Sequence, residues 1–317
     1  MPVPPEHKTR WSDALELKLR RASGDAFQAF FADIMECRYP GDFVRVKASG
    51  SLGDKKCDGF LQSTVEVFQC YGAENGGAKK ESVNATLTAK MEKDYMGACG
   101  HWADMTAWSM VHNFIDGVGA TTLAKMQELK KANPQHALSF FGPPRFKQVI
   151  FELESDQIEE LIGRAATEAD FLNLQAPEVL AIMEAIMKAT SDNLPMDLTI
   201  KAVPVNKLSF NGLSGAFQRK IVMGRQNETA VQALIEEHPN PLYATTVANE
   251  FRRRYLDLRY QDLNPNTIMT ELFNSLVGVG NVSQERDVAA WSLLAYLFER
   301  CTIFEDVPVA ADATVDA

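Results

Sequence analysis

The sequence lacks the features that would place this chain in a membrane or make it a P-loop enzyme. No apolar run approaches the roughly 18 consecutive residues that a membrane span needs, and the first ten residues are proline-rich and polar, unlike a secretory signal peptide. A G-x-x-x-x-G-K-[ST] phosphate loop does not occur either. We therefore expect a cytoplasmic protein, with no membrane as partner, that does not hydrolyse nucleotides through a P-loop.

Cysteine is scarce, and its pattern excludes two further classes. The chain has 5 cysteines, an odd number, and no C-x-x-C pair. Neither a disulfide framework nor a zinc knuckle is encoded by such a pattern. We expect the thiols to be reduced and mostly buried; they are Cys37, Cys57, Cys70, Cys99 and Cys301.

An excess of positive charge is also missing, since the net charge is −10. The imbalance is local, however: residues 1–110 hold 14 Lys or Arg against 15 Asp or Glu, so nearly all the excess acid follows residue 110. A short basic strip can contact phosphate without a basic total. The strip available here consists of Lys79, Lys80, Lys90 and Lys93.

The chain has enough apolar residues to form the cores of two domains, since 46% of its 317 residues are hydrophobic. The first part mixes helical and strand patterns, which predicts a mixed α/β sheet flanked by helices. Helical spacing covers residues 12–39 (one long helix or two short ones), 83–97 and 121–132. Strand patterns cover residues 42–47, 57–61, 64–71, 106–114, 136–141 and 146–153.

After residue 155 the periodic segments are all helical. Residues 197–205, flanked by Pro195 and Pro204, are extended and linker-like, so we place a domain boundary near residue 205. The expected organisation is an α/β domain over residues 10–205, an all-α domain over 206–310, and a loose acidic tail over 311–317.

The residues that point most directly to chemistry lie between two of the expected strands. Asp54 and Asp58 enter a short strand in the sequence G-D-K-K-C-D-G, and Gln69 lies on the next strand. Phosphodiester hydrolysis uses a divalent cation, an activated water and a group that neutralises developing charge. Mg²⁺ or Mn²⁺ needs only one or two carboxylates plus another oxygen ligand. Asp58 and Gln69 would bind the metal, Asp54 would be an auxiliary ligand, and Lys90 would assist the water.

Plainer interpretations compete with parts of this hypothesis. Asp-Gly and Gly-Asp are common turn dipeptides, so Asp54 taken alone fits a turn residue better than a ligand. Strand alternation places Glu66 on the face opposite Gln69, where we expect it to be solvent-facing. His112, which with Asn113 could suggest a ββα-metal nuclease, is better explained as a partly buried histidine at the end of a strand.

The N-terminal pattern resembles the PD-(D/E)xK nuclease superfamily, the restriction-endonuclease-like class. Its core order of helix, three strands, helix and strand matches residues 12–114, with Asp58 at the first motif position and Gln69 at the second. Tyr71 stands where the family has its lysine, and some members carry that lysine on the next helix, where Lys90 or Lys93 could supply it, with Lys79 and Lys80 as further candidates. The resemblance implies a metal-dependent endonuclease acting on double-stranded DNA, or a nuclease fold without activity if no lysine reaches the site.

The C-terminal segment 289–308, A-A-W-S-L-L-A-Y-L-F-E-R-C-T-I-F-E-D-V-P, resembles a second family. It is similar to the end of the C-terminal domains of bacterial ABC-three-component (Lamassu-like) antiphage defence systems, in which an effector works beside an SMC-like ATPase and a small middle subunit. The resemblance implies an effector that binds those partners and is a homo-oligomer in some state. The alternative is an inactive subunit that binds nucleic acid or acts as a scaffold.

Overall fold

The computed structural model describes residues 5–47, 55–77, 80–189, 207–278, 280–300 and 303–304 of the 317. The chain forms two compact units, Met1–Ala165 and Ala166–Ala317. None of the helices in the described ranges combines the length and the apolar character required to cross a membrane.

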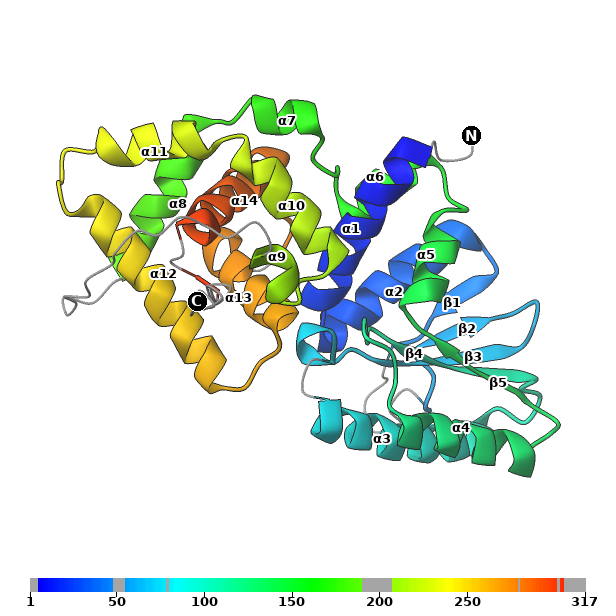
Figure 1. The fold of residues 1–317 in the computed structure, drawn as a ribbon. Coiled ribbons are helices and arrows are strands. Elements are labelled where there is room, and N and C mark those ends of the chain that lie inside the picture. Colours follow the sequence, from blue (N-terminus) through cyan, green and yellow to red (C-terminus); the bar gives the residue numbers. More distant parts are fainter. Residues whose placement is uncertain are drawn as a thin grey trace, which may run out of the picture. The chain divides into compact units, whose positions relative to one another are not determined.

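The N-terminal unit is built on a five-stranded mixed sheet whose strand order follows the chain (Figure 1). β1, β2 and β3 are antiparallel, whereas β4 runs parallel to β3 and β5 parallel to β4. The strands are β1 (Phe43–Arg45), β2 (Gly59–Leu61), β3 (Glu66–Tyr71), β4 (Ala107–His112) and β5 (Ala137–Phe141). The mixed α/β sheet expected from the sequence is therefore confirmed.

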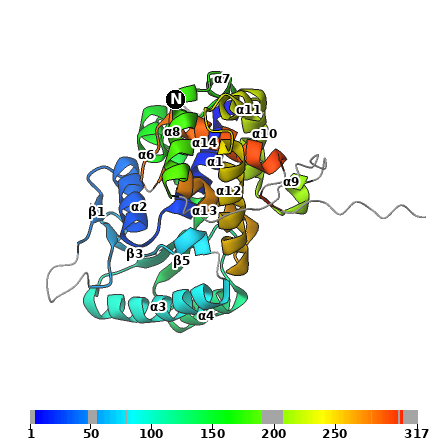
Figure 2. The same cartoon turned by 90° about the vertical axis from the view of Figure 1, so that its left-hand side faces the viewer.

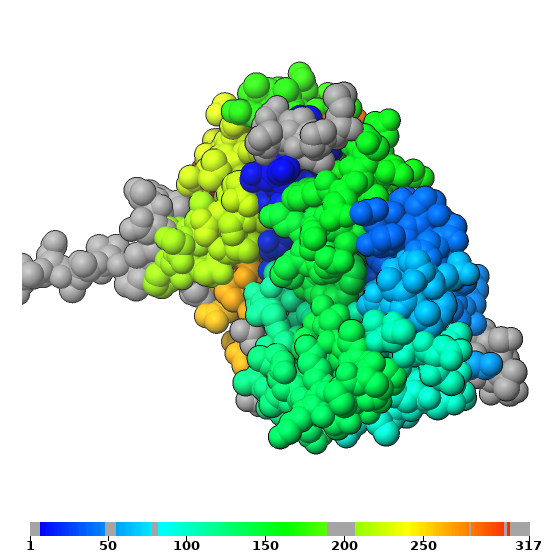
Figure 3. Space-filling model, turned by 90° about the vertical axis from the view of Figure 1, so that its right-hand side faces the viewer, coloured from blue at the N-terminus to red at the C-terminus, as the bar shows by residue number. Residues whose placement is uncertain are grey.

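Helices cover both faces of this sheet (Figures 1 and 2). One face carries α1 (Pro5–Arg21), α2 (Gly24–Arg38), α5 (Pro143–Ile150) and α6 (Ser155–Ile162). The other carries α3 (Lys80–His101), which follows the short 3-10 turn η2 (Glu74–Gly77), and α4 (Ala120–Ala132). Alternation along β3 sends Phe68 into the first core and Val67 into the second. Figure 3 shows the green segment with β5 and α5 lying beside the blue segment with α2 and β1.

One strand expectation for this unit needs correction. Residues 12–39 lie in two helices, which is one of the two possibilities expected, but residues 146–153 lie in and just after the helix α5 instead of forming a strand. Pro143 occupies the first turn of α5, and Phe146, Val149 and Ile150 are buried at helical spacing. The strand prediction was wrong because a short apolar run satisfies the strand and helix periods equally well.

The C-terminal unit is all helical within its described residues, as expected. Its centre is α14 (Gln284–Glu299), which is buried nearly all round, from Val288 to Phe298. The other helices are α7 (Glu168–Leu172), α8 (Ala176–Ala189), α9 (Lys207–Phe210), α10 (Gly215–Arg225), α11 (Glu228–Glu236), α12 (Tyr243–Tyr260) and α13 (Pro265–Val277).

The boundary between the units lies at residue 165, not near residue 205 as the sequence suggested. The reason is that α7 and α8 pack on α14 and therefore belong to the helical unit. Val179, Ile182 and Met183 make the buried face of α8. The expected linker 197–205 and the tail 311–317 both lie outside the described residues.

Candidate functional site

Asp58 lies at the entrance to β2 and is the best-connected of the predicted site residues. Its backbone N–H donates to the Phe68 carbonyl (2.8 Å), so it sits directly beside β3. The side chain is 5% exposed. Its carboxylate accepts hydrogen bonds from Gln69 Nε2 (2.6 Å), the Cys70 backbone N–H (2.7 Å) and Gln28 Nε2 (2.9 Å). Three elements, α2, β2 and β3, thus meet at one carboxylate.

Gln69 carries the second predicted oxygen. The residue is 2% exposed, and its Oε1 is buried and makes no hydrogen bond within the described part of the chain. An unpaired buried acceptor is costly and normally has an explanation in function or in a missing ligand. An amide oxygen is also a ligand that Mg²⁺ accepts. Asp58 is contacted by the amide nitrogen of Gln69, and the amide oxygen of the same side chain is left available as a second ligand for a hard cation.

A larger acidic metal centre is not found. Among the residues that the structure describes, no three His, Cys, Asp or Glu side chains gather closely enough to hold a metal ion. Asp54, the expected auxiliary ligand, lies outside the described residues. Asp58 and Gln69 are thus the predicted ligands that the described residues bring together.

Two lysines share one buried carboxylate beside this site. Lys90 Nζ lies 2.5 Å from Asp94 Oδ2, and Lys56 Nζ lies 2.9 Å from Asp94 Oδ1. Asp94 is only 1% exposed. Lys93, one turn from Lys90, is exposed and forms no ion pair within the described ranges. Of these two α3 lysines, Lys90 is therefore the one held in place by a buried partner.

The Cys70 thiol connects the two groups electrostatically. Burial raises the pKa of Cys70 well above its ordinary value, the Asp58 charge acts in the same direction, and the Lys90 charge lowers it. Asp58 and Lys90 therefore both lie within electrostatic range of one thiol. Lys79 lies outside the described residues, and the side chain of Lys80 is not described, so neither is placed at the site.

Tyr71 stands where the nuclease resemblance would place a lysine, and it has a structural role. Its ring contacts that of Phe114 at 6.0 Å between centroids, and burial raises the pKa of its hydroxyl. A half-buried phenol cannot replace an ammonium group near a phosphate. The positive charge at this site comes from the loop before β2 and from α3.

Gln28, Lys56 and Asp94 were missed by the sequence analysis. Gln28 is a half-buried amide between the core residues Phe27 and Phe30 of α2, and a polar residue within an apolar repeat was the available signal. Asp94 follows Lys90 at the i+4 spacing of a helical ion pair. Nothing local in the sequence distinguishes Lys56 from Lys55.

His112 is a buried histidine at the end of β4, as expected. It is 4% exposed, its ring packs against Phe114 and Phe140, and burial lowers its pKa to about 4. The adjacent Asn113 joins three backbone segments, since its amide donates to the carbonyls of Leu19, Ala22 and Ala73. These two residues support the fold and do not form a metal centre.

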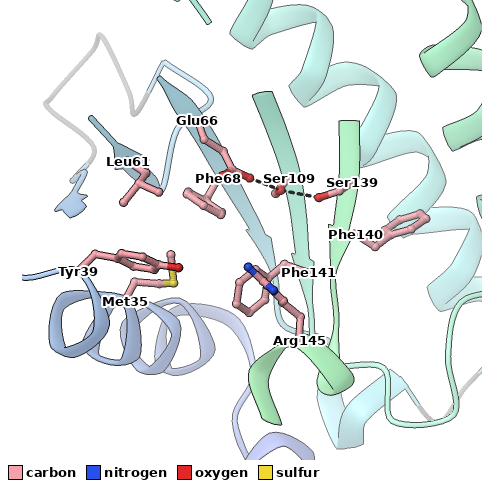
Figure 4. A pocket seen from close by; sticks show the side chains of 10 residues that line it. All are labelled: Met35, Tyr39, Leu61, Glu66, Phe68, Ser109, Ser139, Phe140, Phe141 and Arg145. Atoms are coloured by element: carbon pink, nitrogen blue, oxygen red, sulfur yellow. Dashed lines mark hydrogen bonds between the residues drawn. The ribbon is translucent and has the colours of Figure 1, made fainter. Parts of the chain in front are cut away.

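Glu66 was expected to face solvent and does not. It lies on the face opposite Gln69, as the alternation indicated, but α2 and α5 cover that face, so Glu66 is half-buried. Its carboxylate accepts a hydrogen bond from Ser109 (2.6 Å), and burial raises its pKa. Glu66 lines a cavity of about 320 Å³ together with nine other residues, all drawn in Figure 4.

Comparison with known proteins finds a similarity in the C-terminal part of the chain. No curated protein matches the chain, and no solved structure does. Residues 178–305 match the family model described as C-terminal domain 10 of the ABC-three component (ABC-3C) systems. This range runs from the start of α8 through α14. This part of the chain is thus similar to that C-terminal domain, which supports the C-terminal resemblance inferred from the sequence.

Proposed function

We propose that this chain is the effector subunit of an ABC-three-component antiphage defence system, and that its N-terminal unit is a metal-dependent DNA endonuclease. The C-terminal match supports the defence context. The observation that carries the activity is the contact of Asp58 with Gln69, whose Oε1 is buried and unpaired, on a sheet of three antiparallel strands followed by a parallel one.

In this proposal each residue has a separate task. Asp58 and Gln69 hold a Mg²⁺ or Mn²⁺ ion, which would polarise the scissile phosphate and a bound water. Gln28 and the Cys70 N–H fix the orientation of the Asp58 carboxylate. Lys90, held by Asp94, orients the attacking water or balances charge on the phosphate.

A second candidate rests on the same contacts. Asp58 already accepts three hydrogen bonds, as a purely structural buried carboxylate would, and Tyr71 replaces the usual lysine. A nuclease fold without activity, serving as a nucleic-acid-binding or scaffolding subunit of the defence complex, is consistent with these two facts.

Plasmid cleavage distinguishes the candidates. Supercoiled DNA would be incubated with the chain, alone and with its ATPase and middle subunits, in Mg²⁺ or Mn²⁺ and in EDTA. We expect metal-dependent nicking that Asp58→Asn slows at least about a hundredfold, as loss of a charged metal ligand does. Asparagine preserves the shape of the side chain, and the exposed Asp104→Asn is the matched control.

Each outcome has a clear meaning. Nicking by Asp58→Asn at the wild-type rate would remove Asp58 from the site. If the assembled complex cuts no DNA in either metal but still retains DNA on a filter, the inactive, nucleic-acid-binding candidate is correct.

A further inference from the structure

The cavity on the α2 and α5 side of the sheet has an unusual polar floor. Glu66, Ser109 and Ser139 lie on β3, β4 and β5, and hydrogen bonds join them in a row (Figure 4). The positions next to them on this face are aromatic, including Phe68 and Phe141. Polar side chains on a core-facing sheet surface are costly, and such departures from the expected pattern concentrate at functional sites.

The direction of the hydrogen bonds shows what the floor offers to a ligand. The Ser109 hydroxyl donates its one hydrogen to Glu66 Oε1 (2.6 Å), so in the 2.7 Å contact between the two serines Ser139 must be the donor. The atoms that remain able to accept a hydrogen bond from a ligand are Glu66 Oε2 and the hydroxyl oxygen of Ser139. Ser139 is exposed, so the row can be reached from solvent at the β5 edge.

The opposite wall offers donors. Tyr39, the C-terminal cap of α2, and Arg145, in the first turn of α5, line the cavity from the helix side (Figure 4). The Arg145 charge is close enough to lower the pKa of Glu66, against the effect of burial. Apolar side chains, among them Met35 and Leu61, complete the walls. The volume of about 320 Å³ lies at the lower end of the range for small-molecule sites.

We propose that this cavity binds a guanine base, free or as a nucleoside. Guanine presents two adjacent N–H donors, which match the carboxylate of Glu66, and next to them a carbonyl acceptor, which matches Arg145 and Tyr39. Its flat ring fits between apolar and aromatic side chains. Paired recognition by a carboxylate is the kind of contact that distinguishes bases by their exocyclic amines. The inference does not depend on the nuclease proposal, because it rests on Glu66 and Arg145, and neither residue is assigned to the metal, the water or the phosphate there.

Inosine provides the test, because it differs from guanosine only by the missing 2-amino group. Calorimetric titration of the full-length chain should show guanosine binding roughly ten times more tightly than inosine, or more, as expected for a two-point contact. Glu66→Gln should abolish this preference, since an amide accepts only one of the two donors. Glu159→Gln, at an exposed position on α6, is the matched control and should retain it.

Three results would overturn the proposal: no guanosine binding by the wild-type chain, equal affinity for guanosine and inosine, or an unchanged preference in a Glu66→Gln protein with a wild-type melting curve. The comparison of the two nucleosides needs no variant. It therefore decides the matter even if Glu66→Gln fails to fold.

Discussion

Asp58 and Asp94 are both buried carboxylates, and their partners give them opposite roles. Gln28, Gln69 and a backbone N–H donate hydrogen bonds to Asp58, and these three groups are neutral. Two ammonium groups contact Asp94, and together they exceed its charge. A negative point suited to a cation therefore lies near a net positive point suited to a phosphate, which is the charge pattern that phosphodiester hydrolysis requires.

Lys90 and Lys93, both on α3, give a matched pair of variants. We expect Lys90→Ala to lower the cleavage rate about a hundredfold or more, because an oriented ammonium group near the reacting phosphate is lost. Lys93→Ala should leave the rate within about twofold, since single exposed side chains without such contacts have small effects. Initial rates of plasmid nicking would measure both. Equal effects of the two variants would remove Lys90 from its assigned role.

His112 makes the stability of the N-terminal unit sensitive to acid. Burial lowers the pKa of His112 to about 4 from an ordinary value of 6.5, so between these values the unfolded chain binds a proton that the folded chain does not. The free energy of unfolding therefore carries no penalty from His112 above pH 6.5. It falls as the pH drops to 4, by up to about 3 kcal/mol in total. Chemical denaturation at a series of pH values, with His112→Gln as comparison, would measure this loss. Parallel curves for the two proteins would contradict the assignment.

The candidate site was only partly predictable for a physical reason. Asp58 and Gln69 lie on adjacent strands, so local patterns were enough to bring them together. Gln28 reaches Asp58 across 30 positions of sequence, and Lys56 meets Asp94 only because the loop before β2 packs on α3. Contacts of this kind depend on tertiary packing, which no periodicity encodes.

At the scale of secondary structure, Gly224 is a helical position where close packing between two helices matters more than the low helix propensity of glycine. α10 and α14 are in contact along their length, and a Cβ on Gly224 would lie 2.5 Å from the Trp291 carbonyl oxygen. Gly100, in α3, has no neighbouring atom within 4 Å of the same position. One glycine is required by packing and the other is not.

The same substitution should therefore have opposite effects at these two positions. We expect Gly224→Ala to destabilise the helical unit by about 1–3 kcal/mol through overpacking. Gly100→Ala should stabilise the N-terminal unit by up to about 1 kcal/mol, because alanine favours a helix. Thermal unfolding of both variants would give the two signs. A stabilised Gly224→Ala protein would show that α10 and α14 can separate without cost.

The helices also show where sequence patterns succeed. The helical pattern expected after residue 155 holds for α12 (Tyr243–Tyr260), whose apolar spacing extends over several turns. The five-residue helix α7 was not predicted, since one turn shows no period, and the strand expected at residues 146–153 was a helix. Long amphipathic elements are determined locally, whereas short ones are determined by what covers them.

At the scale of the whole chain, two units carry two separable properties. The ABC-three-component match covers residues 178–305, within Ala166–Ala317, and the Asp58 site lies within Met1–Ala165. The revised boundary places α7 and α8 in the helical unit. A truncation at residue 205, which the sequence suggested, would leave these two helices without α14.

A chain ending at Ala165 tests this division. We expect it to fold, to keep any nicking activity, and to lose association with the ATPase and middle subunits. Co-purification with tagged subunits, together with sizing, would measure association, and the full-length chain is the control. Retention of the short chain in the complex would place partner binding in the N-terminal unit instead.

The strand order of the sheet has a consequence for biosynthesis. Because the order β1 to β5 is also the order of synthesis, each strand finds its neighbour already made when it leaves the ribosome. Domains generally fold as units from the N-terminus while synthesis continues. The N-terminal unit would thus be complete, with the Asp58 site formed, while the segment that matches the ABC-three-component domain is still being translated. If the proposed effector role is correct, any restraint supplied by the chain itself during that interval must come from residues before 166.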